Sequence, residues 1–343
     1  MKYLSLFSWI GGFELWIQQA YEKSNVSTSS LNKQVMIHME EWSTNTQQEC
    51  LGTQQPTCIG FSEIDKYASQ VYKSHFPNHH EYGDITKIDE NNLPDFDLLV
   101  GWFPCQAFSI AWKRKWFEDT RGTLFFEIAR ILRAKQPRLL WLENVKGLLS
   151  HDNGKTFSTI IATLDELGYD IQWQVLNSKN HWVPQNRERV FIIWHLRGTP
   201  RPEVFPFGWQ SNENSTIGIT TETAVARTLT AGWHSGWNHN GMTIIQINQP
   251  KHSNDRVYSE EGLSPTLNTM QGGNRQPFVE VKPRIRRLTP GECLALQWFP
   301  RNWCDILSDS QKYKCSWNAV TVNMIEDIAK RLLKEKFKIN LQS

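Results

Sequence analysis

The sequence predicts an α/β fold whose sheet is mainly parallel, followed by a smaller, loop-rich domain. Short apolar runs rich in β-branched residues alternate with helical patterns from the first residue to about residue 197, as in stacked βαβ units. From about residue 199 to about residue 282 helical patterns are few, while Gly, Thr and Asn are frequent. The length of 343 residues agrees with roughly two domains of about 150 residues each.

The expected strands and helices follow one another along the first part of the chain. The strands are residues 3–7, 58–62, 97–101, 138–143, 171–176 and 189–195. Residues 124–132 and 156–167 have apolar side chains at helical spacing, and the second of these patterns stops before Gly168, as helices often do. Residues 25–57 are rich in Ser, Thr, Asn and Gln, which predicts a polar surface insertion. Residues 318–337 carry the apolar stripe of an amphipathic helix.

Composition excludes several classes of protein. With 39% hydrophobic and 21% charged residues, the chain is neither disordered nor collagen-like. No run approaches the roughly 18 apolar residues of a membrane-spanning helix, and the first apolar run lacks a signal-peptide cleavage site, so we expect a cytoplasmic protein without membrane contact. The cysteines form no metal-binding pattern, so no metal site is expected. A net charge of +2 argues against a nonspecific nucleic-acid coat.

The segment GWFPCQAFS (residues 101–109) places Cys105 just after a strand, at the sheet edge where ligands bind in α/β folds. Pro104 predicts a rigid turn that presents the thiol, and the basic residues Lys113, Arg114 and Lys115 favour the nucleophilic thiolate. Taken alone, a cysteine in such a turn is more often a buried structural residue than a nucleophile.

Two further motifs carry charged side chains to the same region. LENV (residues 142–145) ends another strand, so Glu143 is expected in the same crevice, where a carboxyl with a raised pKa can hold or donate a proton to a ring nitrogen. PQNRERV (residues 184–190) places Arg187 and Arg189 outward at the start of a strand, where their guanidinium groups suit a phosphate or a carbonyl. In isolation, a helix-capping acid and two surface arginines are equally good interpretations.

In this order and spacing, FPCQ, ENV and RERV closely resemble the DNA cytosine-5 methyltransferases, and the resemblance covers nearly the whole chain. FSWIGG is similar to the family's first cofactor loop, SEID to its ribose-binding segment and GDI to its adenine contact. RRLTPGECLALQWFP and NAVTVNM are similar to its last two motifs. The resemblance implies an α/β fold with a Rossmann-like, S-adenosyl-L-methionine-dependent methyltransferase sheet and a loop-rich target-recognition domain.

The family's organisation implies three parts of the chain and a set of partners. Residues 1–198, with the insertion at 25–57, would form the cofactor-binding and catalytic domain. Residues 199–286 would form the target-recognition domain, and residues 287–343 would return to complete the catalytic domain. The resemblance implies a monomer that methylates double-stranded DNA with S-adenosyl-L-methionine as cofactor. A cognate restriction endonuclease is a candidate partner, and orphan or phage DNA modification is the other setting.

The family's chemistry implies a role for each motif. The Cys105 thiolate would add to carbon 6 of a flipped-out cytosine, so that carbon 5 can attack the donor's methyl group. Glu143 would hold the ring nitrogen, while Arg187 and Arg189 would lie near the base carbonyl or the cysteine loop. The cofactor's ribose hydroxyls would donate to Glu63 and its adenine amino group to Asp84. The other implied cofactor contacts are Phe7, Ser8, Ile10, Gly11, Gly12, Ile64, Ile85, Leu124, Asn318 and Ala319.

Tryptophan is unusually frequent, with 16 residues against 20 glycines. Because an indole opposes both a close backbone approach and a positive φ, Trp9 and Trp317 would crowd the donor site and Trp102 the cysteine turn. We hypothesise that a reassigned UGA codon, read here as tryptophan, is decoded as glycine by the organism. Tryptophan stands where the family has glycine at Trp9, Trp102, Trp112, Trp116, Trp182, Trp194, Trp298 and Trp317, with Trp16 as a further candidate.

Three alternatives stay open at this point. If the tryptophans are genuine, the chain is expected to be a catalytically impaired homologue that still holds DNA. An RNA cytosine-5 methyltransferase has the same fold, although the long recognition region and the FPCQAFS turn favour a DNA enzyme. A thiol enzyme or a nicotinamide-dependent oxidoreductase on a Rossmann-like sheet explains the first strand and little else.

Overall fold

A six-stranded mixed sheet forms the centre of the molecule, with strand order β2-β1-β3-β4-β6-β5. The computed structural model describes residues 1–25, 55–104, 124–207, 257–259, 264, 278–281 and 284–339. All the expected strands are present, with ends displaced by one or two residues. They are β1 (Lys2–Leu6), β2 (Thr57–Ser62), β3 (Leu98–Trp102), β4 (Leu139–Val145), β5 (Tyr169–Asn177) and β6 (Glu188–Leu196).

The sheet is parallel only in its first part. Strands β2, β1, β3 and β4 run parallel, whereas β6 is antiparallel to both β4 and β5. The expectation of a mainly parallel sheet therefore holds for β1 to β4. Strand β5 turns back into β6 through the short segment 178–187, and such a short connection joins antiparallel strands, because a parallel pair needs a longer crossover.

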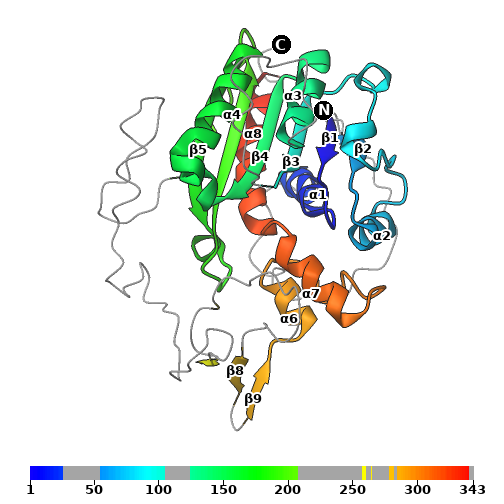
Figure 1. The fold of residues 1–343 in the computed structure, drawn as a ribbon, viewed down its shortest axis with the longest axis vertical. Helices are drawn as coiled ribbons and strands as arrows, with labels where there is room; N and C mark the ends of the chain where they lie inside the picture. The colour runs from blue at the N-terminus through cyan, green and yellow to red at the C-terminus, as the bar shows by residue number, and fades with distance from the viewer. Residues whose placement is uncertain are drawn as a thin grey trace.

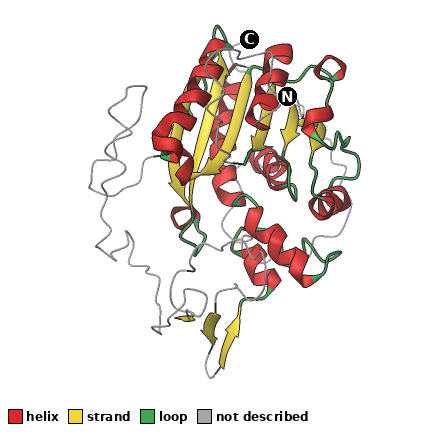
Figure 2. Ribbon diagram, viewed as in Figure 1, coloured by secondary structure: helices red, strands yellow, loops and turns green. Residues whose placement is uncertain are grey.

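Helices cover both faces of the sheet, as Figures 1 and 2 show. Alternate side chains along the strands pack against opposite helices, so Tyr3 and Trp141 belong to one core and Leu4 and Leu140 to the other. Helices α1 (Gly12–Asn25) and α8 (Val322–Ile339) contact the first core. Helices α3 (Leu124–Lys135) and α4 (Lys155–Glu166) contact the second. Gly168 follows α4 with a φ of 89°, as its predicted place after a helix end requires.

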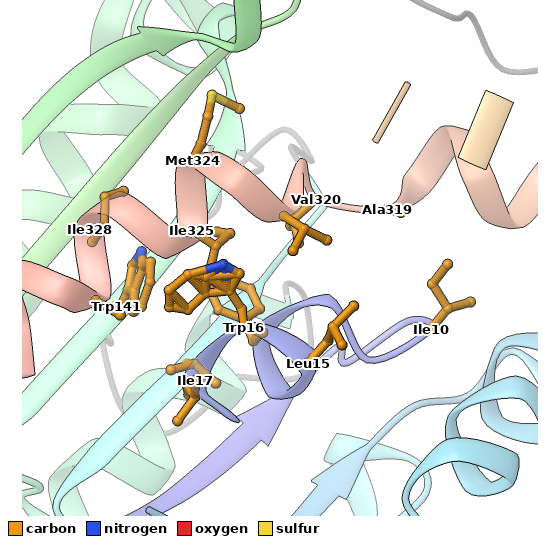
Figure 3. Packing of buried hydrophobic residues seen from close by; sticks show 14 of the residues in the cluster. Ile10, Leu15, Trp16, Ile17, Trp141, Ala319, Val320, Met324, Ile325 and Ile328 are labelled. Carbon is orange, nitrogen blue, oxygen red and sulfur yellow. The ribbon is translucent and has the colours of Figure 1, made fainter. Parts of the chain in front are cut away.

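The last part of the chain returns to the sheet. Helices α6 (Pro290–Ala295) and α7 (Asp309–Asn318) precede α8, whose side chains Ile325 and Ile328 lie close to Trp16 of α1 and Trp141 of β4 (Figure 3). The expectation of one helix over 318–337 was wrong at its start. The chain is extended at Ala319, with φ −67° and ψ 147°, and α8 begins only at Val322.

A second, three-stranded sheet lies apart from the first (Figure 1) and consists of β7 (Val257–Ser259), β8 (Phe278–Val281) and β9 (Arg284–Arg287). Strand β8 pairs with both neighbours. Ser264 forms a bridge with Gln185 just before β6, so Ser264 lies against the segment that leads into β6 of the large sheet. None of the described helices is long and apolar enough to cross a membrane.

Candidate functional site

The loop between β1 and α1 forms the floor of the candidate cofactor site. The chain turns sharply after Leu6, because Phe7 and Trp9 have φ values of 54° and 51°. The Ser8 hydroxyl donates to the Ser5 carbonyl (3.1 Å), and the Gly11 amide donates to the Ser8 carbonyl (3.0 Å). Gly11 has a φ of 85°, which a residue without a Cβ adopts readily.

Gly12 brings this loop against the returning segment. A Cβ at Gly12 would lie 2.5 Å from Cγ2 of Val320, so no larger residue fits without a shift of that segment. The same side of the loop is closed by Trp303, whose indole N–H donates to the Ile10 carbonyl at 2.9 Å. The N-terminal loop and the C-terminal part of the chain thus build one site.

Glu63 follows β2 and faces the loop. Its Oε2 accepts the Trp9 amide (2.9 Å) and its Oε1 accepts the Asp65 amide (2.8 Å). Burial raises the pKa of this carboxyl, and the two backbone amides oppose the rise. Each oxygen keeps a lone pair, so Glu63 can still accept from a ribose hydroxyl.

The expected adenine contacts divide into exposed and buried side chains. Ile64 is 72% exposed, as a surface against which a ring can pack requires. Asp84 caps the short helix η1 (Ile85–Lys87) and accepts from the Thr86 amide and hydroxyl, which lower its pKa. Ile85 is 2% exposed within the second core, so only its backbone can face a ligand. Leu124, the first residue of α3, is half-buried beside that core.

A small pocket lies between these elements. Its walls include six of the residues expected to bind the cofactor, together with Trp9, Phe13, Trp102 and Val320. The Trp9 indole N–H donates to the Cys315 carbonyl (2.8 Å), which holds the ring across the pocket. The space that remains is ≈ 10 Å³, about what one water molecule needs. The six expected residues are Phe7, Ser8, Ile10, Gly12, Asn318 and Ala319.

The charged centre lies at the end of β4. Glu143 is 1% exposed, and its Oε1 lies 2.9 Å from Nε of Arg189 on the neighbouring strand β6. Burial raises the pKa of Glu143, while the positive charges of Arg189 and Arg187 oppose that rise. The prediction that the two arginines point outward was wrong, because Arg187 is 2% and Arg189 8% exposed.

Arg187 also reaches the cofactor side. One of its terminal nitrogens donates to the carbonyls of Trp317 (3.2 Å) and Ala319 (3.0 Å), and its guanidinium lies 5.5 Å from the Trp317 ring centroid. The turn between α7 and α8 therefore connects the candidate donor pocket with the arginine that faces Glu143. No local sequence pattern predicts this link, since Arg187 lies 130 and 132 positions from Trp317 and Ala319.

The cysteine turn starts beside Glu143. Trp102 pairs with Glu143 in the register of β3 and β4, and the Asn144 side-chain amide donates to the Phe103 carbonyl at 2.8 Å. Asn144 thus fixes the residues that lead into Cys105, a role that the ENV motif had not been assigned. Cys105 itself, with Trp112 and Trp116, lies outside the described residues.

Comparisons with known proteins identify the family. The model of the C-5 cytosine-specific DNA methylases matches residues 1–334. The chain is 37% identical over 287 residues to the type II methyltransferase M1.ScrFI of Lactococcus lactis subsp. cremoris, covering 82% of this chain and 73% of that protein. It is 36% identical to M.HhaI of Haemophilus parahaemolyticus over 288 residues, covering 79% and 86% of the two chains.

A phage protein and a solved structure are also similar to this chain. The orphan methyltransferase M.SPRI of Bacillus phage SPR is 31% identical over 411 aligned positions, covering 80% of this chain and 91% of that one. The structure of S. pombe Dnmt2 superposes with a TM-score of 0.62 at 13% identity, covering 98% and 99% of the chains. At that identity the match shows the fold alone.

The fold and the family matches define an S-adenosyl-L-methionine-dependent methyltransferase. More specifically, the chain belongs to the C-5 cytosine-specific DNA methylase family. It is a DNA (cytosine-5-)-methyltransferase of the restriction-modification or phage orphan type.

The indoles narrow one part of the candidate cofactor site. Between Trp9, Trp102 and the returning segment only ≈ 10 Å³ remains, about what one water molecule needs. The surrounding residues Glu63, Ile64 and Asp84 have the polarity and exposure that the cofactor needs. Trp9 and Trp102 are the two largest side chains in the wall of this narrow part.

Proposed function

We propose that Cys105, Glu143, Arg187 and Arg189 form the catalytic centre for methylation of a flipped-out cytosine. The observation that carries this assignment is the register of β3 and β4, which sets Trp102 opposite Glu143. Asn144 holds the Phe103 carbonyl, so the chain enters the Cys105 turn next to the buried carboxyl. Our proposal therefore assigns the Cys105 thiol and the Glu143 carboxyl to the same sheet edge, where ligands of α/β folds bind.

Each group has a chemical role that follows from its type and surroundings. A Cys105 thiolate that bonds to carbon 6 of cytosine makes carbon 5 electron-rich. Glu143, whose pKa burial raises, can hold a proton at the ring nitrogen while that bond forms. Arg189 neutralises the carboxylate when the proton has left. S-adenosyl-L-methionine supplies an electrophilic methyl group when bound.

The same proposal assigns a role to each part of the chain. Residues 1–198 form the catalytic domain and 287–343 its returning segment, which α8 anchors against α1. Residues 199–286 form the target-recognition domain, whose polar loops read base edges of double-stranded DNA. A base in a duplex must leave the stack to meet Cys105, at a cost of a few kcal/mol. We place the enzyme in the cytoplasm as a monomer, with a cognate restriction endonuclease as a candidate partner.

Bisulfite sequencing tests this proposal. The chain with glycine at positions 9, 102, 112, 116, 182, 194, 298 and 317 is expressed in cells without cytosine-5 methylation. Modification is expected in one short motif and is expected to vanish in Cys105→Ala and Glu143→Ala. A 5-fluorocytosine oligonucleotide should trap a covalent complex with the parent and none with Cys105→Ala. Methylation that persists in Cys105→Ala contradicts the assignment of the nucleophile.

A further inference from the structure

We infer that positions 9, 102, 182 and 298 are glycine in the protein that the organism makes, and that the fold was built for glycine there. Three of these residues have a left-handed backbone, with φ values of 51° at Trp9, 63° at Trp182 and 63° at Trp298. L-residues with large side chains rarely adopt this conformation, because Cβ approaches the following carbonyl oxygen. The observation concerns the backbone of this chain and needs no comparison with other proteins.

Trp298 occupies the place in a helix-ending motif that glycine usually holds. After α6 the Phe299 amide donates to the Leu294 carbonyl (3.1 Å), and the Trp298 amide donates to the Ala295 carbonyl (2.9 Å). This pair of bonds is the Schellman motif, in which the residue at the position of Trp298 must be left-handed. Trp182 likewise ends the short helix η6 (Ser178–His181) with a left-handed backbone.

Burial of the indole offsets little of the strain at Trp182 and only part of it at Trp298. Trp182 is 88% exposed and Trp298 is 44% exposed, so burial of apolar surface stabilises neither fully. Strained residues persist where packing or a function holds them, and the described surroundings of Trp182 hold no such packing. Glycine satisfies both turns without a side chain.

The two indoles at the pocket act against the family's chemistry. Trp9 lies across the donor site, with its N–H bonded to the Cys315 carbonyl, and Trp102 forms a further wall. Glycine at both positions removes the two largest side chains of the wall and leaves Glu63, Ile64 and Asp84 in place. The backbone amide of residue 9 can still donate to Glu63, since that bond uses no side chain.

Trp303 differs from these four positions, because its side chain stabilises the fold. Its indole N–H donates to the Ile10 carbonyl (2.9 Å), and its ring stacks on His75 at 3.5 Å with an interplanar angle of 6°. It is 6% exposed. The chain therefore contains two kinds of tryptophan position. At one kind the indole is buried and hydrogen-bonded, as at Trp303. At the other the indole strains the backbone or fills the pocket, and we attribute these positions to UGA codons read as tryptophan.

Peptide mass spectrometry of the protein purified from its natural source tests the inference directly. Peptides that contain positions 9, 102, 182 and 298 are expected to have the mass of glycine, and the peptide with position 303 the mass of tryptophan. The gene is expected to carry UGA at the four positions and UGG at position 303. Tryptophan in the native peptides at 9, 182 and 298 overturns the inference, whatever the enzyme's activity.

A binding experiment tests the pocket, and this arm rests on the proposed function. S-adenosyl-L-methionine binding without DNA is measured by equilibrium dialysis for the chain as written and for W9G/W102G/W182G/W298G. At least a hundredfold tighter binding is expected for the fourfold variant. The matched control W9A/W102A/W182G/W298G keeps Cβ atoms in the pocket and should bind more weakly than the fourfold variant. Equal affinity of the written chain and the fourfold variant contradicts the inference, whereas binding without any methylation contradicts only the proposed function.

Discussion

At the scale of single residues, the charged centre shows how burial makes a carboxyl useful. Oε1 of Glu143 lies 2.9 Å from Nε of Arg189, and the carboxyl is almost completely buried. The same side chain therefore has a raised pKa and a fixed positive charge beside it. Removing one member of such a buried pair leaves an uncompensated charge, which is costly. The ion pair therefore orients the carboxyl in a state from which it can take or release a proton.

The backbone at Trp182 leads to a prediction about stability. Trp182→Gly relieves the left-handed strain at an exposed turn, and we expect it to raise the free energy of unfolding by about 1 kcal/mol. Trp182→Ala removes the same indole but keeps a Cβ, so no comparable gain is expected. Urea denaturation of the two variants and the parent measures the difference. A gain of equal size for both variants would show that the indole, and not the backbone, carries the cost.

At the scale of helices and strands, a buried relay joins three segments. The Gln297 side-chain amide donates to Oε1 of Gln185 (3.0 Å), and the Thr321 hydroxyl donates to Oε1 of Gln297 (2.7 Å). Gln185 and Gln297 are fully buried, and Thr321 is 1% exposed. The relay fixes the start of β6 and the start of α8 to the turn after α6, and so positions Arg187 relative to the pocket wall.

Gln297→Leu should therefore destabilise the protein. The variant leaves the Thr321 hydroxyl and the Gln185 oxygen buried without their partner, which costs about 1–3 kcal/mol for each group. We expect a loss of about 2–6 kcal/mol in chemical denaturation. Asn302→Ala, at an exposed position of the following loop, is the control and should change stability by less than about 0.5 kcal/mol. Similar stability of Gln297→Leu and the parent would contradict a structural role of the relay.

The positions of helices and strands were predictable from the sequence wherever the spacing of apolar residues fits only one type of element. The strands of the large sheet were read correctly because β-rich runs are short and bounded by turn residues, as at Leu139–Val145. The antiparallel direction of β5 and β6 was not, because direction depends on the connection and not on the strand's own pattern. The break at Ala319 was missed because the apolar stripe continues on both sides of it, whereas the backbone at Ala319 is extended.

The candidate site was predictable where motifs name residues and not where contacts join distant segments. Glu143 and the arginines were proposed as site residues from their motifs, but their burial could not be predicted from spacing, since the packing of β4 against β6 causes it. Ile85 is expected as a cofactor contact, and because its side chain lies in the second core that contact would have to be made by its backbone. The bonds from Arg187 to Trp317 and Ala319 depend on the return of α8 to α1, which no local pattern encodes.

At the scale of the whole molecule, the two ends of the described chain stabilise each other. Helix α8 packs on α1, and both cover the face of the sheet formed by β1, β3, β4 and β6. The candidate donor pocket lies at the contact between their N-terminal ends, with Gly12 against Val320. Cofactor binding and folding of the returning segment are therefore expected to support each other.

Glu14 couples the stability of this assembly to pH. It lies in the first turn of α1 and is 1% exposed, and burial raises its pKa to about 7, while the hydroxyls of Ser5 and Tyr72 oppose the rise. An unfolded chain returns the carboxyl to its ordinary pKa of 4.5. Because the folded-state pKa is the higher one, the contribution of Glu14 to stability is fully present below pH 4.5 and is lost as the pH rises toward 7.

Glu14→Gln removes this proton-linked term while keeping the shape of the side chain. Between pH 4.5 and pH 7, the parent should lose about 3 kcal/mol relative to the variant. Urea denaturation over this pH range measures both curves, with Glu166→Gln at an exposed position as the control that should follow the parent. Parallel curves for the parent and Glu14→Gln would show that Glu14 stays ionised in the folded protein. The expected divergence places the lost stability at the contact of α1 with β1 and with α2 (Lys66–His75), which weakens as the pH rises from 4.5 to about 7.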